Sequence, residues 1–292
     1  RLKQVASKQV QGVIPAEPSS VNSILEMSIS SSINPATYNY LSSGYKKAEA
    51  GGYDFVLIKM NTPGGLVSTT KQILTMIGSS KLPTIVWVTP EGASATSAGA
   101  IIASGAHLLL MSHGTNIGAA TPIQMNKDIE KGDAKNKAVN DLVALVSSLA
   151  ETRGRNPELF AKMIKEAASY GSSESLEKKL IDGIVSTYAE LASFLDGRII
   201  LHQGKSLQLS AFNPRIDIFE MDLGQKLLNI LANPNMAYIL FLTPVAKNPK
   251  DFSASHYQIE IDFEQHRYKL SQLLDKAYYA FGEDNFEVAE KL

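Results

Sequence analysis

The chain of 292 residues contains no cysteine. This absence excludes disulfide bonds, thiolate metal sites and a cysteine nucleophile. An excess of charge of one sign is also missing, because 28 Lys and Arg residues balance 29 Asp and Glu residues to a net charge of −1. Without a basic excess there is no electrostatic footprint for nucleic acid, so no nucleic-acid partner is expected. No signal sequence with a basic start and an apolar core is visible either.

Long hydrophobic runs are scarce. The uncharged stretch 227–246 has the length of a bilayer span, but prolines and asparagines interrupt it and only residues 236–242 are continuously apolar. We interpret it as a core segment or as the beginning of a transmembrane helix that this chain does not complete. A hydrophobic content of 44% is nevertheless ample for a packed core, which excludes a wholly disordered chain.

Short apolar segments alternate with helical patterns along the chain. A helix is expected from Asn34, as the N-cap, and Pro35 to about Ala50, where Gly51 follows. This alternation predicts an α/β layer architecture with parallel strand pairing. The expected strands are 24–29, 53–60, 85–88, 107–111 and 181–185, the further helices 139–150, 157–168 and 173–180, and a hairpin covers 198–212.

Four regions are expected from composition and pattern. They are a polar lead-in over 1–23, a folded domain over 24–222, an amphipathic or hydrophobic segment over 223–246, and a polar linker with a helical tail over 247–292. In the tail, residues 267–281 have the periodicity of an amphipathic helix.

Two loops of small residues each follow a buried strand. They read NTPGGL at 61–66 and GASATSAGA at 92–100. Small residues let a backbone approach a ligand closely, and a serine between a strand and a helix has an exposed hydroxyl near the positive end of the helix dipole. Backbone amides from both loops could converge on an oxyanion. Each motif alone is also typical of an ordinary turn; the ordered pair is far more specific.

A serine nucleophile needs a base, and the residues alone leave it undecided. His107 and His113 lie near the end of a strand, although surface or hydrogen-bonded structural roles fit all five histidines better. The alternative is a lysine, with candidates at positions 127, 131, 135 and 137 ahead of the helix at 139–150. Helical phase favours Lys135, about 40° from Val139, and places Lys137 on the opposite face if the helix already includes it.

The ordered series of motifs resembles the NfeD-type membrane-associated serine proteases, which are relatives of Clp protease and signal peptide peptidase A. The resemblance covers roughly residues 24–242. The runs that carry it are NTPGGL at 61–66, EGASATSAG at 91–99, GAATP at 118–122, KAVND at 137–141, SLA at 148–150, RGRN at 153–156 and NPNMAYIL at 233–240.

The resemblance implies a fold of the α/β class, with Clp/crotonase-like stacked ββα units and a helical C-terminal tail. It implies a Ser–Lys dyad in which Ser97, before Ala-Gly, is the nucleophile and Ser94 is not. The family's lysine, just ahead of the helix that carries SLA, matches Lys137, and this outweighs the phase argument for Lys135. The position matching the catalytic histidine of Clp protease is close to Pro122, with no histidine nearby.

The same resemblance implies an oxyanion hole built from the backbone amides of Gly65 and Ala98, with Gly64 and Gly99 supporting the loops. The expected activity is ATP-independent hydrolysis of peptide bonds in hydrophobic segments of membrane-associated proteins, with stomatin-like proteins as substrates or partners. No metal, nucleotide or other cofactor is implied. A homodimer or larger homo-oligomer is expected, with the protease domain extracytoplasmic at a membrane.

Two alternatives belong to other functional classes. A crotonase-type acyl-CoA enzyme would share the architecture and the paired oxyanion loops, but it needs a carboxylate base, for which only Glu91 lies beside the serine loop. A catalytically silent scaffold could bind a membrane protein through the same groove. The presence of both Ser97 and Lys137 argues against the scaffold.

Overall fold

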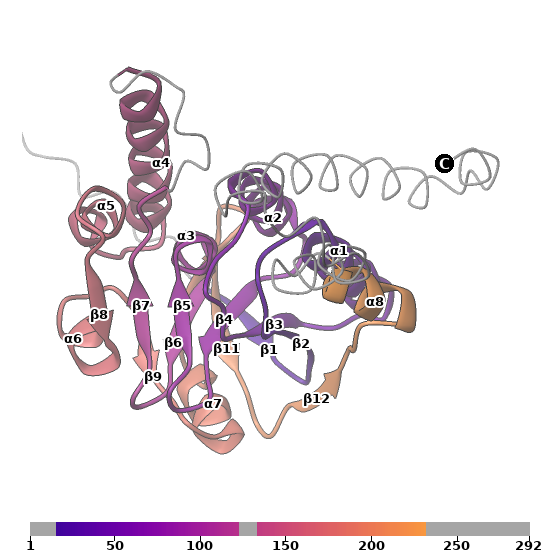
Figure 1. Ribbon diagram of the computed structural model, residues 1–292. Coiled ribbons are helices and arrows are strands. Elements are labelled where there is room, and N and C mark those ends of the chain that lie inside the picture. The colour runs from indigo at the N-terminus through magenta and orange to yellow at the C-terminus, as the bar shows by residue number, and fades with distance from the viewer. Residues whose placement is uncertain (1–15, 123–132, 232–292) are drawn as a thin grey trace, which may run out of the picture.

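The computed structural model describes residues 16–122 and 133–231. Its centre is a six-stranded sheet in the order β12-β2-β3-β4-β6-β9, in which every pairing is parallel (Figure 1). The sheet confirms the predicted strands of the first half. Its strands are β2 Ser23–Ile29, β3 Phe55–Met60, β4 Thr84–Val88, β6 Leu108–Met111, β9 Gly183–Ile184 and β12 Arg215–Ile218.

Each face of this sheet has its own hydrophobic core, as a parallel sheet covered on both sides requires. The covering elements of one face are the helices α1 Pro35–Ala50, α2 Val67–Ser79, α3 Ala98–Gly105, α4 Asp133–Thr152 and α5 Pro157–Lys165. The other face packs against α7 Tyr188–Leu195 and a three-stranded sheet of β1 Glu17–Ser20, β11 Lys205–Ser210 and β10 Ile199–His202. Strands β10 and β11 form the predicted hairpin.

A second, small sheet of β5 Ser94–Thr96, β7 Asn116–Gly118 and β8 Ser169–Gly171 stands beside the main sheet. Thr62 extends it through a bridge to Ala95. The chain therefore runs three times from a main-sheet strand, through the small sheet, into a helix: β3 to α2, β4 and β5 to α3, and β6 and β7 to α4. This arrangement confirms the expected stacked ββα units.

The ends of several elements differ from the predictions. Residues 17–20, expected in a loose lead-in, form β1 because they pair with β11, a partner nearly 190 residues away. Helix α4 begins at Asp133 instead of 139. The predicted helix 173–180 is α6 Ser172–Glu177, which ends three residues earlier. Strands β5, β7 and β8 are three residues long each, too short for periodicity to define.

The start of α1 is as predicted. Asn34 caps it by accepting from the Thr37 amide at 3.2 Å, and the Thr37 hydroxyl accepts from the Asn34 amide at 3.3 Å. The last described element, α8 Leu223–Leu231, packs against α1. The predicted helical tail over 247–292 lies outside the described residues.

Candidate active site

The two small-residue loops meet at Ser97. Gly64 has a φ of +111°, and a Cβ built there would lie 2.5 Å from the Cβ and 3.0 Å from the Oγ of Ser97. Any larger residue at 64 would therefore collide with the serine and be strained as well. The predicted convergence of the loops is confirmed, and Gly64 is the residue that permits it.

Ser97 connects β5 to α3 in a conformation that few L-residues adopt. Its φ of +54° and ψ of −116° match the first central position of a type II′ turn, which favours glycine. An N-cap serine normally has an extended backbone and accepts from an amide of the first turn. Here the side chain makes no capping bond, so the Oγ is left available at the positive end of α3.

Two backbone amides beside Ser97 lack acceptors within the described part of the chain. Ile33 pairs with the loop on either side of Gly65, donating to the Gly64 carbonyl at 2.8 Å and accepting from Leu66 at 2.9 Å. The amides of Gly65 and of Ala98, the first residue of α3, donate to no acceptor among the described residues. Two free donors next to a serine hydroxyl are the elements of an oxyanion hole.

Hydrogen bonds hold the glycine loop to β5. The Thr62 amide donates to the Ser94 carbonyl at 2.8 Å, and the Thr96 amide donates back to Thr62 at 3.1 Å. The Thr62 hydroxyl accepts from the Gly64 amide at 3.1 Å. A Cβ at Gly99 would lie 2.6 Å from Thr62 Cγ2, so Gly99 allows α3 to pack this closely. Gly64 and Gly99 thus both support the loops sterically.

Ser94 and Ser97 have different environments. Ser94 lies within β5, opposite Asn116, and its amide donates to the Asn61 side chain at 3.2 Å. Only Ser97 stands at the start of a helix. Its amide donates to the Gly118 carbonyl at 2.9 Å, which ties the serine to the end of β7.

Lys137 lies inside α4, because the helix begins four residues before it, and its side chain is exposed. The residues of α4 that the structure describes as buried are Leu142, Val146 and Ala150, all C-terminal to Lys137. Figure 1 shows α4 extending past α3 and α5. Among the described residues, no hydrogen bond joins Lys137 to Ser97. Lys135 lies in the same helix, and Lys127 and Lys131 fall outside the described residues.

The remaining residues considered as bases lie elsewhere. His113 and Glu91 are exposed on the loops that follow β6 and β4. His107 is buried at the opposite end of α3 from Ser97, where its Nδ1 accepts from the Thr84 amide at 3.1 Å. Burial, reinforced by the charge of nearby Arg153, lowers its pKa to about 3. The interpretation of His107 as a hydrogen-bonded structural residue is confirmed.

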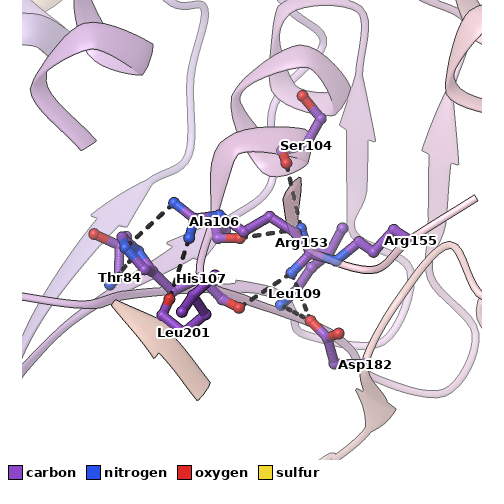
Figure 2. A network of polar contacts seen from close by, with 9 residues as sticks. All are labelled: Thr84, Ser104, Ala106, His107, Leu109, Arg153, Arg155, Asp182 and Leu201. Carbon is purple, nitrogen blue, oxygen red and sulfur yellow. Dashed lines mark hydrogen bonds and ion pairs between the residues drawn. The ribbon is translucent and has the colours of Figure 1, made fainter. Parts of the chain in front are cut away.

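Sequence patterns missed the buried network around His107 (Figure 2). Arg155 donates to the carbonyls of Ser104 and Ala106 at 3.3 and 3.0 Å and forms a 2.5 Å ion pair with Asp182. Its side chain is almost entirely buried. The Arg155 guanidinium thereby satisfies carbonyl groups at and after the end of α3. A run such as RGRN gives no sign that one arginine points inward.

Comparison with known proteins places the chain. The family model for the NfeD1b N-terminal domain matches residues 23–199. The chain belongs to this family. Over 225 residues it is 32% identical to the membrane-bound protease PH1510 of Pyrococcus horikoshii, covering 75% of this chain and 50% of that protein. The NfeD-family chain thus spans about half the length of this curated relative.

Solved structures agree with this assignment. A serine-to-alanine mutant of the 1510-N membrane-bound stomatin-specific protease superposes with a TM-score of 0.64 at 30% identity, covering 69% of this chain and 99% of that one. A lysine-to-alanine mutant of that protease, in complex with a substrate peptide, gives 0.65 at 30% identity, covering 71% and 96%. The family predicted from the motifs is therefore confirmed. In the described part of this family member, no helix has the length and apolar character of a bilayer span.

Proposed function

We propose that the chain is a serine endopeptidase with Ser97 as its nucleophile. The observation that carries the proposal is the strained strand-to-helix turn at Ser97, which leaves the hydroxyl uncapped, together with two nearby backbone amides that have no acceptor among the described residues. A nucleophile at such a turn and paired amide donors are the parts that acyl transfer requires. Relatives named as proteases, one of them solved as a serine mutant, support it.

The proposed reaction begins when the Ser97 Oγ attacks a peptide carbonyl and transfers its proton to the base. The amides of Gly65 and Ala98 donate to the oxygen of the tetrahedral intermediate. The base then returns the proton to the leaving amine, and an ester on Ser97 remains. Water, deprotonated by the same base, hydrolyses the ester and regenerates the serine. None of these steps consumes ATP.

Lys137 is the base in this proposal. The resemblance to the family's motifs favours a lysine at this position, and a relative solved with a substrate peptide is a lysine-to-alanine mutant, which supports a lysine base. The exposed position of Lys137 on α4 means that the proposal requires α4 and Ser97 to approach each other in the working enzyme. Lys135, one half-turn earlier, is the competing base.

The proposed substrates are hydrophobic segments of membrane-associated proteins, including stomatin-like proteins, cleaved at a membrane. A relative named as membrane-bound and solved relatives named as stomatin-specific support this class. Exposed Leu66 and Val67, which follow the oxyanion loop, offer apolar contacts to such a segment. By the same resemblance, the domain works outside the cytoplasm. It is also proposed to form a homodimer or larger assembly, whose mass analytical sedimentation would measure.

Replacement of the nucleophile tests the proposal most directly. We expect Ser97→Ala to lower the cleavage of a hydrophobic fluorogenic peptide by at least about 10³-fold, because the acyl-enzyme can no longer form. The matched control is Ser94→Ala, three residues earlier in the same loop, which should retain activity. Undiminished cleavage by Ser97→Ala would refute the assignment.

The two lysines are separated by a second pair of variants. Lys137→Ala should lose about 10³-fold in kcat, while Lys135→Ala, in the same helix, should retain most of the activity. The Lys137 side chain is exposed, so its substitution should not lower the melting temperature appreciably. Loss of activity in Lys135→Ala alone would transfer the role to Lys135.

A further inference from the structure

Thr62 is a buried threonine near the start of the loop 61–66 and is only 1% exposed. Its hydroxyl lies between two backbone groups from different parts of the chain. The hydroxyl accepts from the Gly64 amide at 3.1 Å and donates to the Ser31 carbonyl at 2.7 Å. Its single proton is therefore used within the protein, and Thr62 offers a substrate no donor of its own.

The loop has few other restraints at this point. Pro63 has no amide hydrogen to donate, and Gly64 has no side chain that could restrict its backbone. The φ of +111° at Gly64 lies outside the range that other residues favour. The conformation of Gly64 consequently depends on the hydrogen bonds of its two peptide groups.

The segment 31–33 holds both of these peptide groups. Ile33 donates directly to the Gly64 carbonyl at 2.8 Å, and Ser31 holds the Gly64 amide through the Thr62 hydroxyl. The segment is itself anchored, because the Asn229 side chain donates to the Ser31 hydroxyl at 3.1 Å. Thr62 is thus the only side chain in this chain of contacts that lies within the loop.

The same contacts set the direction of the Gly65 amide. The peptide bond between Gly64 and Gly65 is trans, so its N–H points opposite to its C=O and therefore away from Ile33. Ser97 contacts the loop at Gly64, where a built Cβ would lie 3.0 Å from the serine Oγ. The amide proposed to bind the oxyanion is therefore only as well aligned as Gly64 is held.

We propose that Thr62 is a positioning residue for the reaction, whose hydroxyl fixes Gly64 and thereby aims the Gly65 amide at the oxyanion. This inference rests on the proposed function, in which that amide is one of the two donors. A donor contributes to catalysis when its orientation is fixed before charge develops. Loss of the Thr62 hydroxyl should therefore weaken binding of the transition state and leave binding of the substrate almost unchanged.

The methyl group of Thr62 has a separate contact. Its Cγ2 lies 2.6 Å from the position of a Cβ built at Gly99, so it packs against the start of α3. Two substitutions separate the two parts of the side chain. Thr62→Val keeps the methyl group and removes the hydroxyl, whereas Thr62→Ser keeps the hydroxyl and removes the methyl group.

The first experiment measures kcat and KM of the full chain on a hydrophobic fluorogenic peptide. Thr62→Val should lower kcat by about 10- to 100-fold and change KM by less than about twofold, and Thr62→Ser should restore kcat to within about threefold of the parent. The matched control is Thr84→Val at the start of β4. It removes an equally buried hydroxyl, hydrogen-bonded to Tyr45 at 2.6 Å, and should leave kcat unchanged.

The second experiment compares two inhibitors with the same peptide sequence. A peptide aldehyde adds the Ser97 hydroxyl across its carbonyl, and the resulting oxygen occupies the oxyanion hole, whereas the corresponding peptide amide binds without a covalent bond. Thr62→Val should bind the aldehyde about 10- to 100-fold more weakly and the amide within about twofold of the parent. If Thr62→Val does not fold, Thr62→Ala against Thr62→Ser gives the same comparison, since they differ by one oxygen atom.

Three results would overturn the role of Thr62. They are an unchanged kcat in Thr62→Val, an equal loss in Thr62→Ser, which would assign the effect to the methyl group, and an equal loss of affinity for the aldehyde and the amide. An inactive Ser97→Ala beside a fully active Thr62→Val would refute the positioning role alone. Full activity in Ser97→Ala would instead refute the proposed nucleophile, so the two failures are distinguishable.

Discussion

The two ends of α3 show how one short helix serves two opposite requirements. At its N-terminus, Ser97 is strained and uncapped, and the Ala98 amide lacks an acceptor in the described structure. At and beyond its C-terminus, Arg155 hydrogen-bonds the carbonyls of Ser104 and Ala106 and pairs with Asp182. Unsatisfied amides are kept where a substrate would satisfy them, whereas the carbonyls of Ser104 and Ala106 at the other end have a donor.

Loss of the satisfied end should produce the largest effect on stability. Arg155→Met leaves the Asp182 carboxylate without its cation, although the Leu109 amide still donates to it, and leaves the carbonyls of Ser104 and Ala106 without the guanidinium, so the free energy of unfolding should fall by about 3–5 kcal/mol. Chemical denaturation measures this change. Lys178→Met, which breaks an exposed ion pair with Glu174, should cost less than about 0.5 kcal/mol. Similar losses in the two variants would mean that the buried network has no special role.

Acid should lower the free energy of unfolding through protonation of His107, which lies at the C-terminal end of α3. Its pKa in the folded protein, about 3, lies below the ordinary 6.5, so the folded state resists protonation while the unfolded chain accepts it. The contribution of His107 to stability is therefore present above pH 6.5 and is lost as the pH falls toward 3. Between pH 7.5 and 5 the loss is about 2 kcal/mol.

The measurement is the difference in stability between the parent chain and His107→Asn at several pH values. The asparagine oxygen can still accept from the Thr84 amide but cannot be protonated in this range. His202, whose Nδ1 lies 3.0 Å from His107 Nε2, and the cations Arg153 and Arg155 remain in both proteins. A difference that stays constant from pH 7.5 to 5 would contradict the assignment.

At the N-terminal end of α3, relief of the backbone strain at Ser97 should raise the stability, by less than the changes above. Glycine adopts the backbone angles of Ser97 without strain, so Ser97→Gly should be more stable than Ser97→Ala by about 1 kcal/mol, although both are inactive. Thermal unfolding of the two variants side by side isolates the backbone contribution, since neither carries the hydroxyl. A more stable Ser97→Ala would show that the turn at residue 97 stores no strain.

Much of this molecule can be predicted from local patterns. The strands of the main sheet other than β12, the capped start of α1, the hairpin and the two loops around Ser97 all follow from apolar runs, capping residues and small-residue motifs. These features depend on neighbours within a few residues, which is why the patterns reveal them. The roles of Ser97, Gly65, Ala98 and Lys137 in catalysis remain predictions.

The order of motifs by itself determined the family, the Clp-like α/β class and the meeting of two loops, because parallel strands bring the loops that follow them to one edge. Only the tertiary structure decided the rest. Residues 17–20 form a strand because they pair with β11. Helix α4 packs on α3 and α5 and is longer than the predicted helix 139–150. Arg155 points inward and reaches Asp182, 27 residues away. The backbone angles of Ser97 depend on contacts with Gly64 and Gly118, which no local preference of serine would supply.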